Sequence, residues 1–261
     1  YFTPAYGGEE DLIGVVKPAL HTMERLGATL VTTDTGDSNA YFDAEFTVLL
    51  YEFKGQIADY LVRLQNTSMR TLADLIAFNI AHCPREMKYF GQEIFELSQA
   101  TSGDLTDPEY LAARALCLQL SRDEGIDAAL QRDNLDAIVS PSYSFASTPA
   151  AVAGYPNISL PVGLTPRGKP AGIWMYSTFL QEPRLLSLAY DLEQEIKPRS
   201  VPEFLGHVPP EPPDAGICDS SQQPQPPRDL ARDLQPVLDI FPLVFIGLPF
   251  RESARLRQVL L

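Results

Sequence analysis

Prolines divide this chain into a part that can pack and a part that cannot. The chain holds 23 prolines in 261 residues, about twice the average share, and they gather between Pro198 and Pro236 in runs such as PPEPP and QQPQPP. Proline fixes φ and lacks an N–H, and few apolar residues accompany it here, so the stretch is typical of a stiff or disordered linker. We therefore expect a packed domain over residues 1–206, a Pro-rich linker over 207–236 and a short apolar tail over 237–261.

Before the linker, apolar residues recur at helical spacing in several stretches. These stretches are 13–26, 46–64, 71–83, 108–130 and 185–196. Thr71 and Asp74 have the spacing of a capping box, and Asp107 precedes a proline at the first helical position. The pattern predicts several helices with defined starts.

Short β-rich runs lie between these helices. They are Ala28–Val31, Leu135–Val139, Asn157–Leu160 and Gly172–Ser177. The run Leu135–Val139 is apolar throughout, which favours a strand buried beneath helices, and the turn-rich stretch 165–169 predicts that the last two strands are neighbours. Helices alternating with strands indicate an α/β fold, a β-sheet core flanked by helices, followed by a largely irregular C-terminal tail.

Charge and cysteine content narrow the classes of function. The formal net charge of -14 argues against binding nucleic acid, which needs clustered Lys and Arg, and against binding anionic membranes. Cys83, Cys117 and Cys218 are widely spaced and without paired histidines, so we expect buried free thiols, no zinc site and no disulfide framework. Free thiols favour a cytoplasmic location. The apolar tail run Leu238–Phe250 is too short and too interrupted by proline to span a membrane.

Two ordered sets of motifs resemble the amidase-signature family over about residues 12–205. The first comprises EFK at Glu52–Lys54, RTLADLIAFNIAH and YFGQEIFELSQA. The second comprises DPEYL, EGIDAAL, LDAIVSPS, PAAVAGYPNISLPVG, AGIWMYSTF and EPRLLSLAYDLEQ. The resemblance implies that residues 1–206 are the C-terminal portion of an amidase domain, a partial amidase-type mixed β-sheet core flanked by helices.

The resemblance also implies a mechanism. Family members hydrolyse amides with a serine that is activated through a second serine and a lysine, the serines lying in a run resembling GGSSGGS. That run is absent from the 261 residues, and the family places it upstream of the stretch that matches here. Lys54 does not match the catalytic lysine, and we expect it to be ion-paired or solvated. We therefore assign no catalytic residue, no metal and no cofactor.

In the family, segments of this half line the substrate cleft. The serine-rich loop after Leu135–Val139 is accordingly the predicted substrate contact, with Ser140, Ser142, Tyr143 and Ser144 as its residues. The alternative is a plain surface turn.

Two functions stay open at this point. The first is hydrolysis of carboxamide C–N bonds on a small-molecule amide, with this chain completed by the segment that carries the nucleophile. The second is a non-catalytic amidase-like remnant that binds a ligand or a partner chain.

Overall fold

The computed structural model describes residues 9–142, 147–199, 201, 203, 204, 206–218 and 243–247. The chain divides into two compact units. The first contains residues 1–38, 118–201 and 237–261, and the second contains residues 39–117 and 202–236. Tyr143, Ser144 and most of the stretch 219–261 lie outside the described residues.

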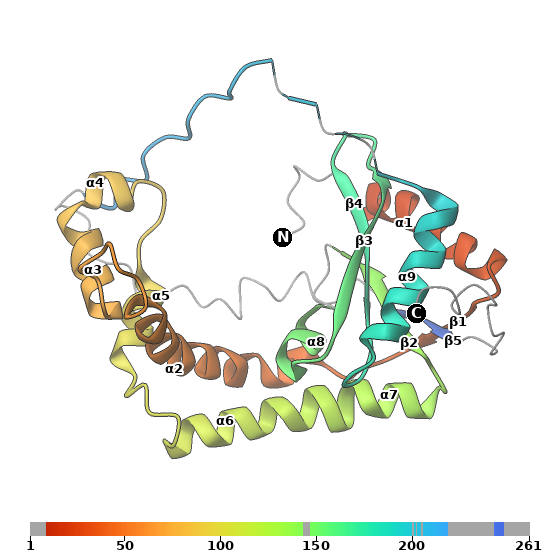
Figure 1. Cartoon of the computed structure of the whole chain (residues 1–261), viewed down its shortest axis with the longest axis horizontal. Helices are drawn as coiled ribbons and strands as arrows, with labels where there is room; N and C mark the ends of the chain where they lie inside the picture. The colour runs from red at the N-terminus through yellow and green to blue at the C-terminus, as the bar shows by residue number, and fades with distance from the viewer. Residues whose placement is uncertain are drawn as a thin grey trace. The chain divides into compact units, whose positions relative to one another are not determined.

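The first unit combines helices with a sheet (Figure 1). Its helices are α1 (Glu9–Arg25), the π-helical stretch η3 (Gln119–Ile126), α7 (Asp127–Arg132), α8 (Ser147–Ala153) and α9 (Glu182–Ile196). Its strands are β1 (Thr29–Thr33), β2 (Ala137–Pro141), β3 (Asn157–Leu164), β4 (Pro170–Tyr176) and β5 (Leu243–Gly247). The predicted α/β class is confirmed.

The five described strands form one sheet in the order β1-β5-β2-β4-β3. Every neighbouring pair among these strands is antiparallel, whereas the resemblance implies a mixed sheet. The hairpin β3–β4 is the predicted pair of adjacent strands, and a register shift lies between Pro161 and Gly163. β2 extends two residues beyond the predicted end, because Pro141 still faces Ile173 of β4.

Helices cover both faces of the sheet. One face, which includes Val139 and Met175, packs in a cluster with residues of α1 and α9. The other face, which includes Ile138 and Tyr176, packs with residues of η3, α7 and α8. Because side chains alternate along a strand, β2 is buried on both faces, and Ala137, Ile138 and Val139 are each at most 1% exposed. This is the buried strand that the apolar run predicts.

The second unit is helical. Its helices are α2 (Phe42–Leu61), α3 (Leu72–Ala81), α4 (Cys83–Glu86), α5 (Glu93–Ala100) and α6 (Pro108–Leu118), with the 3-10 turn η2 (Ser38–Tyr41) at its start. α2 and α6 are joined by two reciprocal hydrogen bonds of 2.7 Å, from Tyr51 to Glu109 and from Tyr110 to Glu52. The hydrogen bond to Glu109, aided by burial, raises the pKa of Tyr51 to about 12.

The helix starts follow the sequence closely. The Thr71 hydroxyl accepts from the Asp74 N–H at 3.2 Å, and the Asp74 carboxylate accepts from the Thr71 N–H at 2.9 Å, which confirms the capping box. The hydrogen bond from the Arg70 N–H, and then those from the Thr71 hydroxyl and N–H, hold the pKa of Asp74 below its usual value. Pro108 opens α6 as predicted, whereas Pro84 lies in the first turn of α4 and α3 has already ended at Ala81.

The expectation of free thiols is wrong for two of the three cysteines. Cys83 and Cys218 form a disulfide across a sequence separation of 135, and Cys117 is buried and free. Burial raises the pKa of the Cys117 thiol to about 11, with a further contribution from Glu45. Spacing along the sequence could not indicate the pairing, because only the fold brings α4 beside the segment that follows residue 206.

Further bonds accompany the disulfide along this segment. Glu211 forms an ion pair of 2.9 Å with Lys88 and accepts a hydrogen bond from Tyr89. The Ala215 N–H donates to the Lys88 carbonyl at 2.8 Å. The start of the Pro-rich stretch is therefore held against the helical unit.

Among the described residues, none of the helices has both the length and the apolar content that a membrane span requires.

Candidate functional site

Two of the four residues predicted to contact substrate lie at the end of β2. Ser140 is 3% exposed, and Ser142 follows the strand directly. The Ser142 N–H donates to the Gly172 carbonyl at 2.9 Å, so the chain stays paired to β4 one residue beyond β2. Tyr143 and Ser144 lie outside the described residues.

A row of polar side chains crosses the sheet at Ser140. Trp174 of β4 faces Ser140 on one side and Ser159 of β3 on the other. Facing residues of adjacent strands point to the same side, so the three side chains share the face that also carries Ile138 and Tyr176. Trp174 Nε1 is buried and has no hydrogen-bond partner among the described residues, which leaves one indole donor available.

Ser142 lies two residues beyond Ser140, next to this row. Its Oγ is 3.2 Å from Ser159 Oγ. A Cβ at Gly172 would come within 2.5 Å of Ser142 Oγ, so the glycine leaves the room that this hydroxyl occupies. A serine hydroxyl is too weak a base to deprotonate another serine, so the pair offers hydrogen bonds to a ligand rather than a nucleophile.

A second polar group fixes the turn between α8 and β3. Asp127 accepts a hydrogen bond from Tyr155 at 2.6 Å and another from Thr178 at 2.7 Å. Burial, and then the bond to Asp127, raises the pKa of Tyr155. One carboxylate at the start of α7 thereby ties the turn before β3 to the segment after β4.

Arg122 supports the same turn from η3. Its Nε donates to the Ala153 carbonyl at the end of α8 at 2.6 Å, and its guanidinium lies over the Tyr155 ring, 5.2 Å from the centroid. Gly154 follows with φ of 65°, a left-handed conformation that glycine adopts at little cost. The arginine thus satisfies a carbonyl at the helix end and also packs on the aromatic ring.

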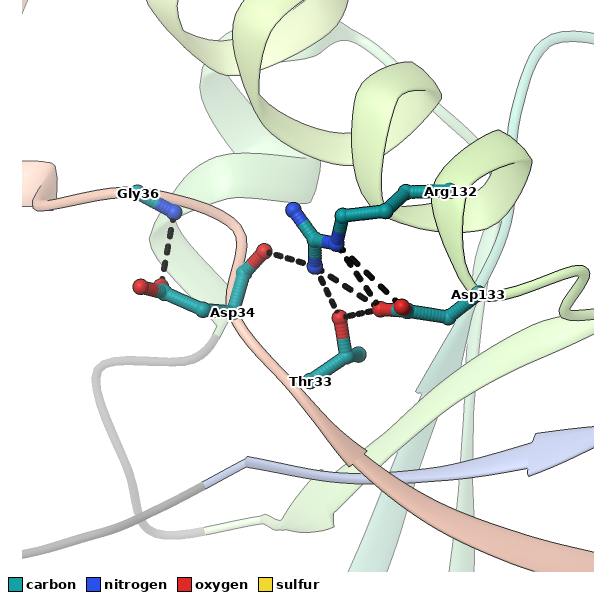
Figure 2. Close-up of polar contacts among 5 residues, drawn as sticks. All are labelled: Thr33, Asp34, Gly36, Arg132 and Asp133. Atoms are coloured by element: carbon teal, nitrogen blue, oxygen red, sulfur yellow. Dashed lines mark hydrogen bonds and ion pairs between the residues drawn. The ribbon is translucent and has the colours of Figure 1, made fainter.

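Figure 2 shows a third polar cluster, at the end of β1. The Arg132 guanidinium donates to Thr33 Oγ1, to the Asp34 carbonyl at 3.0 Å and to Asp133 Oδ2 at 2.8 Å. Thr33 in turn donates to Asp133. The hydrogen bond from Arg132, and then that from Thr33, lowers the pKa of Asp133. Because these groups satisfy one another, the cluster is a structural link between β1 and the end of α7.

Lys54 takes neither role expected of it. Its Nζ donates to the carbonyls of Gln99 and Thr101, at 2.9 and 2.5 Å. These carbonyls lie at the C-terminus of α5, where a cation is favoured by the helix dipole.

No described group of three His, Cys, Asp or Glu side chains could hold a metal ion.

Sequence reasoning found the serines but missed their neighbours. Trp174 and Ser159 lie in motifs that had been recognised, yet only the strand register shows that they flank Ser140. Asp127 and Thr178 are 51 residues apart, and neither has a sequence signal for their contact with one another. The alternation of residues within β4 would have placed Trp174 on the face of Tyr176, but not beside a particular serine.

Known proteins of similar sequence are described as amidases. A probable amidase of Arabidopsis thaliana is 36% identical over 174 residues, which cover 66% of this chain and 32% of that protein. A putative amidase of Schizosaccharomyces pombe is 30% identical over 183 residues, covering 64% of this chain and 31% of that protein. The chain therefore spans about a third of the length of these curated relatives. No family model matches the chain.

Solved structures agree with the sequence matches. The native peptide amidase of Stenotrophomonas maltophilia superposes with a TM-score of 0.69 at 38% identity. The match covers 77% of this chain and 43% of the peptide amidase. The similarity therefore extends to the fold of most of the chain.

Proposed function

Because the chain belongs to the amidase-signature family, we propose that it forms part of an enzyme that hydrolyses carboxamide C–N bonds. In this proposal the chain supplies the core sheet and one wall of the substrate cleft. The nucleophilic serine and its activating serine and lysine belong to a segment outside the 261 residues. The observation that carries the proposal is the similarity to amidases together with a hydroxyl-lined end of β2.

The substrate wall consists of the row across the sheet and its continuation into Ser142. Ser140, Ser142 and Ser159 bring hydroxyls to one face, and Trp174 brings an indole N–H without a described partner. Hydroxyl and indole groups donate to a carbonyl oxygen, and hydroxyls also accept from an amide NH₂. A bound carboxamide would thus be oriented by hydrogen bonds, and orientation before attack lowers the barrier of acyl transfer.

The reaction follows from the family's mechanism. The nucleophilic serine attacks the amide carbonyl, ammonia or an amine leaves, and water hydrolyses the serine ester. The role of this chain is binding and exclusion of water. In this proposal the nucleophile and its activating residues lie outside the 261 residues, so we expect the chain alone to be inactive. The similarity to a peptide amidase makes peptide amides the first substrates to test.

The test supplies the chain with a catalytic segment from a related amidase. The chain is assayed alone, and also co-expressed with the part of the Stenotrophomonas peptide amidase upstream of the matching region. Ammonia release from an amidated dipeptide and labelling by a fluorophosphonate are measured. We expect both signals only for the combination. Turnover by the 261-residue chain alone would contradict the proposed division of roles.

The wall is tested within the active combination. Replacing Ser142 by alanine removes one hydroxyl from the row, so we expect kcat/KM to fall roughly tenfold, the equivalent of about one hydrogen bond. Ser68→Ala is the matched control, because Ser68 is exposed in the helical unit. An unchanged kcat/KM for Ser142→Ala would leave the loop a plain surface turn.

A further inference from the structure

The strand between β1 and β2 comes from an unexpected part of the chain. β5 (Leu243–Gly247) pairs antiparallel with β1 over five residues and with β2 over three. Ile246, for example, faces Leu30 on one side and Ala137 on the other. The family-like motifs end before residue 206, so a segment outside them completes the sheet.

β2 requires a partner on this side. Ala137, Ile138 and Val139 are each at most 1% exposed, and β4 pairs with only one edge of the strand. Backbone N–H and C=O groups that are buried away from water must be hydrogen-bonded, and β5 is the strand that meets them among the described residues. The outer edge of β2 is therefore a strand-binding edge.

β1 presents the opposite edge, and a contact independent of β5 holds it in place. β5 is the strand partner of β1 among the described residues. Thr33, the last residue of β1, is hydrogen-bonded to Arg132 and Asp133 at the end of α7. Asp133 lies four residues before the start of β2. The same side chains appear in Figure 2. β1 is thus held by side-chain contacts and β2 by its pairing with β4, and one strand lies between them.

The residues of β5 suit that position. Leu243–Gly247 reads LVFIG, with Val, Phe and Ile as residues that favour strands. Pro242 and Pro249 flank the run and do not interrupt it, because proline is excluded from the interior of a central strand.

We propose that the facing edges of β1 and β2 form an acceptor site for one extended strand, and that residues 243–247 of the same chain fill it. The apolar tail is thus a sheet-completing strand. Its attachment is by main-chain pairing, so a free peptide of the same sequence binds the site when the strand in the chain cannot.

The first test uses proline to remove the pairing. Phe245→Pro deletes an N–H in the middle of β5, and Phe245→Val keeps it at the same position. Hydrogen exchange is followed by mass spectrometry in peptides covering residues 29–33, 137–141 and 170–176. We expect at least tenfold faster exchange of 29–33 in the proline variant and wild-type rates in the valine variant. Unchanged protection of 29–33 in Phe245→Pro overturns the proposal.

The second test restores the strand in trans. A peptide with the sequence of residues 240–250, with two lysines added at each end for solubility, is mixed with full-length Phe245→Pro. We expect protection of 29–33 to return with this peptide and not with a peptide that itself carries proline in place of Phe245. Restoration by both peptides, or by neither, contradicts an acceptor site that recognises main-chain pairing.

The third test reads the register and does not depend on the proline variant folding. Two double-cysteine variants are made in a Cys117→Ala background. One changes both Thr32 and Val244 to cysteine, the other both Val31 and Phe245, and the two residues of each pair face each other. The out-of-register pair Val31 with Val244 is the control. We expect an intramolecular disulfide in at least one facing pair and none in the control. Links between two chains, or no preference for the facing pairs, overturn occupancy by the same chain.

Discussion

At the scale of single residues, Gly172 decides how close Ser142 can come to β4. A Cβ at this position would lie 2.5 Å from Ser142 Oγ and 3.1 Å from the Leu160 carbonyl oxygen. Gly172→Ala must therefore displace the serine or part the hairpin, and we expect a loss of about 1–3 kcal/mol in the free energy of unfolding by urea. Gly14→Ala, in α1 with nothing within 4 Å, is the control and should be neutral or stabilising.

The Arg132 cluster predicts a dependence of stability on pH. The pKa of Asp133 is lowered in the folded chain, so its ion pair contributes stability above the ordinary aspartate pKa and loses it as the pH falls through the folded value. Asp133→Asn should therefore be less stable than the wild type at pH 7, and the difference should shrink below about pH 4. Urea titrations at pH 7, 5, 4 and 3 measure this, and a difference that is constant with pH would contradict it.

Single residues also show what sequence reasoning could reach. Thr71 and Asp74 were assigned from their spacing alone, because a capping box is a contact between residues three apart. Ser140 and Trp174 are 34 positions apart in the sequence, and the pairing that makes them neighbours depends on strand register.

At the scale of elements, Lys54 links two helices of the second unit. It lies in α2, and its bonds to the carbonyls of Gln99 and Thr101 satisfy the end of α5. Lys54→Met keeps most of the side chain and removes the charge, so we expect α5 to lose its cap and the unit to lose about 1.5–3 kcal/mol. Thermal unfolding measures it, with the exposed Lys17→Met as control; equal effects of both would show that charge alone matters.

Strand boundaries were harder to predict than strand positions. The apolar run Leu135–Val139 indicates a buried strand, and β2 is buried, but it includes Ser140 and Pro141. Proline cannot donate to the backbone ladder and is disfavoured within a strand. Pro141 nevertheless faces Ile173 in the last pair of β2, where a missing donor costs least.

At the scale of the whole molecule, the disulfide determines how the chain responds to reduction. Cys83 and Cys218 close a loop with a separation of 135 residues, for which loop entropy favours a stabilisation of roughly 2–5 kcal/mol. In denaturant without reductant we expect one titratable thiol, Cys117, and three after reduction.

Limited proteolysis locates the effect of the bond. We expect Cys83→Ser and Cys218→Ser to speed cleavage within residues 206–218 and Cys117→Ala to leave it unchanged. Three titratable thiols before reduction would show that the bond is not formed. Equal cleavage in all three variants would show that Lys88 and Glu211 hold the segment without it.

The sequence by itself determined several of the helices, the starts of α3 and α6, the buried strand and the resemblance to amidases. Each of these depends on residues near one another along the chain or on the order of motifs, and periodicity and spacing record such information directly. It also placed the serine-rich loop at the end of β2, because a strand and the loop that follows it are local features.

Only the tertiary structure decided which distant residues meet. It paired Cys83 with Cys218, set Trp174 between Ser140 and Ser159, and placed β5 between β1 and β2. The physical reason is common to all three. Long-range contacts are selected by burial and by the pairing of backbone groups across the whole fold, and no local pattern in a single sequence specifies the partner.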